Sequence, residues 1–338
     1  MKKTFIIIFA ALAAFAWAYA WRGGYLRGDG RLVKRSRFLM DTLCAIQAPN
    51  SLGRLKTEAA IERAFDRMAE LDKKFNVVDP ESPVYKFNHD RAPITDPEVV
   101  ALAAASLEVS RLTDGAFDIT VQPLVDLWGF FSTSASSRTV PSPQQVRAAL
   151  AKTGWRRVSV KDGRVTAADG EVRLDFGSIA KGYIIGEGIK EMKAAGLESG
   201  LLLAGGQVQT FGTAAPGQPW KVGLRNPRQE GYIASLPFDT EMGVATAGDY
   251  ERYFEVDGVR YHHIIDPKTG YPARGVMSVS VIGPDPAWAD ALDTALFVMG
   301  PRRALEFARR RGGLDVIVVD AAGKILTSRA GPAGNKQP

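Results

Sequence analysis

The sequence has very few residues that build soft metal sites or disulfides. It contains one cysteine, Cys44, and three histidines, His89, His262 and His263, in 338 residues. A single cysteine excludes an internal disulfide. These residues are too few and too scattered for a zinc spacing pattern, and the adjacent histidines would point to opposite faces of a strand. A metal site here would need oxygen ligands, which favours magnesium.

The features of nucleic-acid-binding proteins are also missing. The sequence has no arginine-rich arm, no RNA-binding aromatic pattern and no zinc finger. Its 43 basic and 37 acidic residues leave a formal charge of +6, which suits anionic ligands without indicating nucleic acid. A hydrophobic share of 46% and a charged share of 24% are typical of a globular enzyme with a large core.

The N-terminus has the pattern of an export signal. Lys2 and Lys3 precede an apolar run at 5–21, and Ala18-Tyr19-Ala20 has the small-x-small form of a cleavage site. We therefore expect a signal peptide at 1–20 and an exported protein, in the bacterial periplasm. The alternative is an uncleaved inner-membrane anchor, because the apolar run is at the short end of the membrane-spanning range.

The rest of the chain predicts an α+β fold with largely antiparallel sheets flanked by helices. Asp162-Gly163 and Asp257-Gly258 predict hairpins. We expect one domain at 21–330, a surface loop and candidate seam at 132–142, and a disordered tail at 331–338. The other expected elements are a strand at 38–48, a helix with the apolar stripe Ile61, Phe65, Met68, Leu71 and Phe75, a helix from Asp96-Pro97 to Gly115, a capping-box helix from Ser142 to near Gly154, and a buried strand at 314–319.

A helix at 286–299 carries carboxylates among apolar neighbours. Asp285-Pro286 predicts its start and Gly300 its end. Asp290, Asp293 and Thr294 fall at i, i+3 and i+4, so they share one face. Burying unpaired carboxylates is costly, and a hard divalent cation removes that cost. The alternative is that this face is solvated.

The segment Leu174-Asp-Phe-Gly-Ser-Ile-Ala-Lys-Gly182 predicts a strand, a tight turn and a helix start. Its glycine allows close backbone approach, and free amides at a helix N-terminus favour phosphate. In the alternative interpretation Ser178 is only an N-cap and Lys181 only a solvated side chain of the first turn.

Seven segments in this order resemble the FAD:protein FMN transferases of the ApbE family, and they run through most of the chain after the N-terminal segment. They are 38–40 (FLM), 82–88 (SPVYKFN), 115–125 (GAFDITVQPLV), 174–182 (LDFGSIAKG), 203–206 (LAGG), 245–250 (ATAGDY), and the pair 261–272 (YHHIIDPKTGYP) with 289–297 (ADALDTALF). Three positions depart from the common family pattern: Asp41 replaces a glycine, Gln207 an acid and Ala247 a hydroxyl residue.

The resemblance implies a set of ligand-binding residues. Magnesium would be held by Ser178, Asp290, Asp293 and Thr294. Asp175 would bind a hydroxyl or base group of FAD, and Lys181 would contact the cofactor as a point charge suited to phosphate oxygens. The family pocket adds Met40, Tyr85, Ala116, Phe117, Asp118 and Ile264, whose aromatic and thioether groups suit flat rings.

The resemblance also implies the reaction. The family moves FMN from FAD to a threonine or serine hydroxyl of a target protein, forms a phosphoester and releases AMP. For the base we favour His263, with an ordinary pKa near 6.5 and Asp266 as its orienting group; His262 is the alternative. The expected acceptor is an electron-transfer subunit with an FMN-binding domain. An FAD pyrophosphatase and a non-catalytic flavin-binding assembly factor are the competing functions.

Overall fold

The computed structural model describes residues 32–131 and 139–329. The predicted signal peptide or anchor, most of the predicted loop at 132–142 and the predicted tail lie outside these residues. The helices are α2 (Arg54–Phe75), α3 (Pro83–Asp90), α4 (Pro97–Leu112), α5 (Gln122–Trp128), α6 (Pro143–Leu150), the 3-10 turn η2 (Trp155–Arg157), α7 (Ala180–Ala194), α8 (Pro286–Met299) and α9 (Pro301–Arg311). Within the described ranges, no helix is long and apolar enough to cross a bilayer.

The strands form one large antiparallel sheet and three small hairpins, so the α+β prediction is confirmed. The large sheet has eight strands in the order β1-β2-β5-β6-β9-β12-β13-β14, and the hairpins are β3-β4, β7-β8 and β10-β11. The strands are β1 (Leu32–Leu39), β2 (Thr42–Pro49), β3 (Val158–Lys161), β4 (Arg164–Ala167), β5 (Gly200–Ala204), β6 (Gln207–Phe211), β7 (Trp220–Arg225), β8 (Tyr232–Phe238), β9 (Met242–Gly248), β10 (Tyr253–Val256), β11 (Val259–His262), β12 (Val276–Gly283), β13 (Asp315–Asp320) and β14 (Ile325–Thr327).

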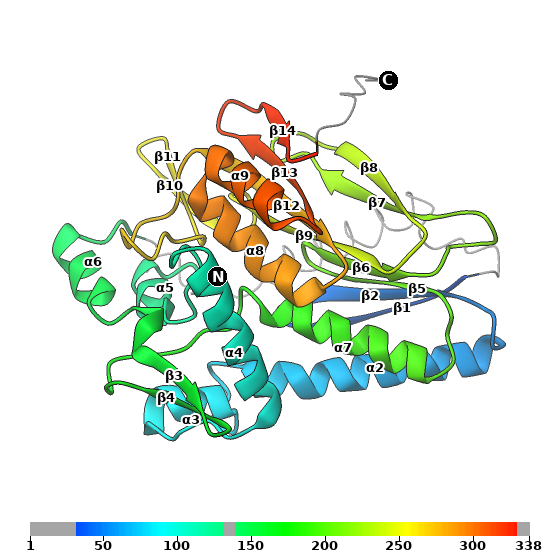
Figure 1. Cartoon of the computed structure of the whole chain (residues 1–338), viewed down its shortest axis with the longest axis horizontal. Helices are drawn as coiled ribbons and strands as arrows, with labels where there is room; N and C mark the ends of the chain where they lie inside the picture. Colours follow the sequence, from blue (N-terminus) through cyan, green and yellow to red (C-terminus); the bar gives the residue numbers. More distant parts are fainter. Residues whose placement is uncertain (1–31, 132–138, 330–338) are drawn as a thin grey trace, which may run out of the picture.

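The two faces of the large sheet bury different partners. Figure 1 shows α2, α7, α8 and α9 along one face, and the β7-β8 hairpin lies against the other. Side chains alternate between the faces along each strand. In β5, for example, Leu202 packs toward the helices while Leu201 packs with Trp220 of the hairpin. Gln207, the first residue of β6, lies on the helix-covered face, where its amide contacts Asp290 of α8.

The helix starts predicted at Asp96 and Asp285 are confirmed. Both side chains accept hydrogen bonds from backbone N–H groups of the first turn, and a proline follows each cap. Ser82, for which no helix start was predicted, caps α3 in the same way. Ser142 forms the predicted capping box with Gln145, although α6 ends at Leu150 rather than near position 154. The apolar stripe of α2 is buried, and the hairpins at 162–163 and 257–258 are present.

The predicted single strand at 38–48 is wrong. The chain instead forms the β1-β2 hairpin, which turns at Met40 and Asp41. Both residues have positive φ, 53° and 55°, as a tight hairpin turn requires. The Met40 N–H donates to Asp72 Oδ2 of α2 at 2.9 Å. Without a glycine or asparagine at the turn, the local sequence carries no hairpin signal.

The predicted strand before α7 is also wrong. Residues 172–176 form no strand, and side chains and loops provide the hydrogen-bond partners of their backbone groups. Asn88 of α3 donates to the Leu174 carbonyl at 2.8 Å and accepts from the Leu174 N–H at 2.7 Å. The Asp175 N–H donates to the Ile119 carbonyl at 2.8 Å. A buried asparagine therefore takes the place of a neighbouring strand.

We expect Asn88→Ala to lower the free energy of unfolding by about 2 kcal/mol, because both polar groups of Leu174 would lose their partner in the core. Chemical denaturation measures this. The matched control is Asn76→Ala, whose side chain caps an exposed turn, so its loss should stay below about 1 kcal/mol. Equal losses in the two variants would contradict the assigned role of Asn88.

Candidate active site

Two aspartates of α8 are buried side by side against β6 and the start of α7. Asp290 and Asp293 are each 2% exposed, so the solvated alternative is wrong for both, whereas Thr294 is partly exposed. Asp290 accepts from the Gly182 N–H at 2.8 Å and from Gln207 Nε2 at 2.6 Å. Asp293 accepts from Thr294 Oγ1 at 3.0 Å, and Gln207 Nε2 lies 3.4 Å from its other oxygen.

Within residues 32–131 and 139–329, Lys181 is the cation whose charge acts on this pair, and it forms no ion pair with either aspartate. Among the described residues, no lysine, arginine or histidine forms an ion pair with Asp290 or Asp293 within 4 Å. Burial raises the pKa of both carboxyl groups, and the Asp290 charge raises that of Asp293 further. Two buried carboxylates without a counter-ion suit a hard divalent cation.

The start of α7 approaches α8 closely because residue 182 is a glycine. A Cβ atom there would lie 2.0 Å from the Pro286 carbonyl oxygen and 2.8 Å from the Asp290 Cβ. Without that atom, the Gly182 N–H reaches Asp290 directly. The residue that caps α7 is Ile179, so the alternative in which Ser178 is the N-cap is wrong. Ser178 lies in the preceding turn and is partly buried.

Lys181 connects the predicted site residues electrostatically. Its Nζ donates to the Gly177 carbonyl at 2.9 Å, and its charge opposes the effect of burial on the pKa of Asp175, Asp290 and Asp293. Burial raises the pKa of Asp175, whose carboxylate accepts from the Gly177 N–H at 2.7 Å. The structure thus brings the predicted residues of α7 and α8 into one site.

His263 follows β11 and is held beside the backbone of Arg252. Burial, chiefly, and the nearby charges of His262 and Lys181 lower its pKa to about 3, so the value near 6.5 expected from the sequence is wrong. Its Nδ1 lies 3.3 Å from the Arg252 carbonyl oxygen, which can only accept. Nδ1 therefore carries the proton and Nε2 is free to act as a base.

The group that orients His263 differs from the predicted one. Asp266 accepts from the Lys268 N–H at 2.9 Å in a tight turn, and no hydrogen bond among the described residues joins it to His263. The Arg252 carbonyl takes that place because β10 and β11 pair and bring position 252 beside 263.

His262 is buried, and its ring is hydrogen-bonded within the protein. It is 3% exposed, its ring packs edge-on against Phe297 of α8, and its Nε2 donates to the Ala273 carbonyl at 2.8 Å. Its Nδ1 accepts from the Ile264 N–H at 3.3 Å. Both ring nitrogens of the neutral form are therefore satisfied, and burial lowers the pKa of His262 to about 4.

This environment predicts a loss of stability in acid. The folded pKa of His262 lies below the ordinary value of 6.5, so the unfolded chain binds the proton more tightly, and stability falls as pH drops from about 6.5 toward 4. We expect the stability difference between the wild type and His262→Gln to shrink by about 2 kcal/mol between pH 7 and pH 4.5. Urea unfolding at the two pH values measures it.

The predicted flavin-pocket residues lie on other elements. Met40 is at the β1-β2 turn and partly buried, and Tyr85 of α3 stacks on His89 with ring centroids 3.9 Å apart. Ala116, Phe117 and Ile264 are buried. Among the described hydrogen bonds and ring contacts, none joins these side chains to the paired aspartates. Their roles in the pocket stay predictions.

Asp118 is engaged within the protein. One carboxylate oxygen accepts from the Thr120 N–H at 2.8 Å and hydroxyl at 2.6 Å, and the other from the Trp155 N–H at 2.9 Å. Burial raises its pKa. Any contact of Asp118 with a flavin would therefore add to hydrogen bonds that already hold the loop before η2.

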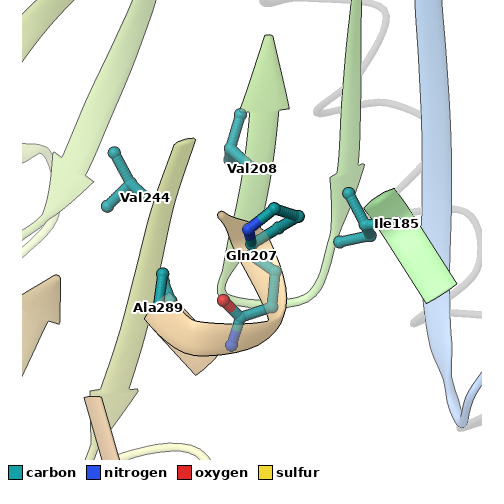
Figure 2. A pocket seen from close by; sticks show the side chains of 7 residues that line it. Ile185, Gln207, Val208, Val244 and Ala289 are labelled. Atoms are coloured by element: carbon teal, nitrogen blue, oxygen red, sulfur yellow. The ribbon is translucent and has the colours of Figure 1, made fainter. Parts of the chain in front are cut away.

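Sequence reasoning left one neighbour of the two aspartates, Gln207, without a role. It entered only as a departure from the family pattern. Strand β6 (QVQTF) holds a second buried glutamine, Gln209, so no local signal in the sequence distinguishes Gln207. Figure 2 shows its side chain between Ile185 and Ala289.

Comparison with known proteins identifies relatives of this chain. The ApbE family model matches residues 40–318. The chain is 36% identical over 241 residues to the FAD:protein FMN transferase of Salmonella typhimurium, covering 69% of each protein, and 31% identical over 313 residues to that of Treponema pallidum, covering 87% of this chain and 86% of the relative.

Solved structures show the same fold. The ApbE protein of Thermotoga maritima superposes with a TM-score of 0.81 at 36% identity, covering 88% of this chain and 97% of that one. The apo flavinyl transferase ApbE of Pseudomonas stutzeri gives 0.75 at 33%, covering 88% and 93%. The chain belongs to the ApbE family. Its activity is that of an FAD:protein FMN transferase.

Proposed function

We propose that this transferase moves FMN from FAD to a threonine or serine hydroxyl of an acceptor protein at a magnesium site made by Asp290, Asp293, Thr294 and Ser178. The observation that carries the proposal is the pair of buried carboxyl groups, with which no described lysine, arginine or histidine forms an ion pair. Magnesium is usually bound through one or two carboxylates together with substrate phosphates, which fits this donor set. When bound, the ion neutralises charge on the pyrophosphate.

The protein's own residues divide the remaining work. Lys181 supplies a positive charge for phosphate oxygens. His263 Nε2 accepts the proton of the acceptor hydroxyl as the oxygen attacks the phosphorus of the FMN moiety. The bond between the two phosphates breaks, and AMP leaves. Because the pKa of His263 is low, the ring is neutral at any pH well above 3.

Incubation of the purified chain with FAD, Mg²⁺ and an FMN-binding domain of an electron-transfer subunit tests the proposal. The intact acceptor should gain the mass of one FMN less water, and chelation of the metal should prevent the gain. Free FMN and AMP with no mass gain on the acceptor would assign the chain to the FAD pyrophosphatases. Flavin binding without turnover would indicate an assembly factor.

We also propose export to the periplasm, supported by the basic, apolar and small-x-small pattern of residues 1–20. Mass spectrometry of the protein from its native host should find a chain that begins at Trp21. An intact Met1 in the membrane fraction would instead support an uncleaved anchor.

A further inference from the structure

Gln207 makes a contact that no other described side chain makes, because its amide lies between the two aspartates. Nε2 is 2.6 Å from Asp290 Oδ1 and 3.4 Å from Asp293 Oδ2. Carboxylate oxygens accept, so the amide must present its donor to both. Gly182 reaches only Asp290, and Thr294 reaches only Asp293. Gln207 is therefore the link between the two carboxylates.

The backbone that carries Gln207 is rigid. It is the first residue of β6, paired with Ala204 of β5 on one side and Ala245 of β9 on the other. The residue is 5% exposed. Figure 2 shows its side chain reaching toward α8, beside a gap that has no room for a water molecule.

We propose that Gln207 is a positioning residue, which holds Asp290 and Asp293 at a fixed spacing before the cation arrives. This inference rests on the proposed magnesium site. A neutral donor stabilises two adjacent buried carboxylates without competing with the ion for charge. The chain thus has a site that is assembled before the metal binds.

Comparison of Gln207→Glu and Gln207→Leu with the wild type tests this role. Thermal unfolding is followed with and without Mg²⁺, and the Mg²⁺ dissociation constant is measured by calorimetry. In the glutamate variant three carboxylates repel one another, so the metal-free melting temperature should fall by several degrees and Mg²⁺ should restore most of it. In the leucine variant Mg²⁺ should bind about tenfold more weakly, and saturating Mg²⁺ should recover kcat.

The matched control is Gln209→Glu. Gln209 lies two residues along the same strand, is 1% exposed and donates to the Pro284 carbonyl at 3.1 Å. A buried charge there should lower the melting temperature equally with and without Mg²⁺. If Gln207→Glu behaves like this control while the wild type is stabilised by Mg²⁺, Gln207 is purely structural and the inference is wrong. A wild type that Mg²⁺ does not stabilise would overturn the magnesium site itself, and this inference with it.

Discussion

Asp293→Ala should reduce Mg²⁺-dependent FMN transfer by about 10³-fold. Loss of a carboxylate ligand removes several kcal/mol of stabilisation of transition-state charge, and each 1.36 kcal/mol is tenfold in rate. The fold should remain, because the metal-free protein loses a buried carboxylate that Asp290 repels. Its free energy of unfolding without metal should stay within about 1 kcal/mol of the wild type. Steady-state transfer assays and metal-free denaturation measure both effects.

Asp285→Ala is the control for this prediction. Asp285 caps the same helix by accepting from the N–H groups of Ala287 and Trp288, and it is exposed. Its loss should cost about 1 kcal/mol of stability but leave the magnesium dependence intact. Normal magnesium dependence in Asp293→Ala would remove this residue from the metal site.

His263→Ala should slow acceptor-dependent AMP release by about 10²- to 10⁴-fold, the usual contribution of a general base. FAD binding should be spared, because Lys181 and Asp175 are unchanged. In the wild type, FAD turnover without acceptor should be slow and should rise steeply when acceptor is added. Since burial lowers the pKa of His263 to about 3, the transfer rate should show no inflection near pH 6.5 from this residue. Quenched reactions assayed for AMP measure the rate of acceptor-dependent release.

The control variant is Asp266→Asn. The Arg252 carbonyl orients His263, so this change should leave the rate of acceptor-dependent AMP release within about twofold of the wild type. An unchanged rate in His263→Ala would remove the histidine from the mechanism. A large loss of rate in Asp266→Asn would restore the orienting role that the sequence predicted for that aspartate.

Local signals in the sequence were sufficient for much of the secondary structure. The caps Asp96 and Asp285 with their following prolines start helices because they satisfy free N–H groups of the first turn. The Asp-Gly pairs at 162 and 257 make hairpins because those residues adopt positive φ. The spacing of Asp290 and Asp293 puts both on one helical face, since three positions are close to one turn. These effects act over a few residues, so the sequence alone can express them.

Tertiary structure determined the features that depend on residues far apart in the sequence. Met40 and Asp41 turn without a glycine because the paired strands and Asp72 hold them. Leu174 needs no strand because Asn88, 86 positions away in sequence, satisfies its backbone. The pKa of His263 depends on burial and on the charges of His262 and Lys181. The aspartates are buried against β6 and α7, where Gln207 and Gly182 donate to Asp290. Desolvation and long-range hydrogen bonds arise only when the chain has packed, so no local pattern encodes them.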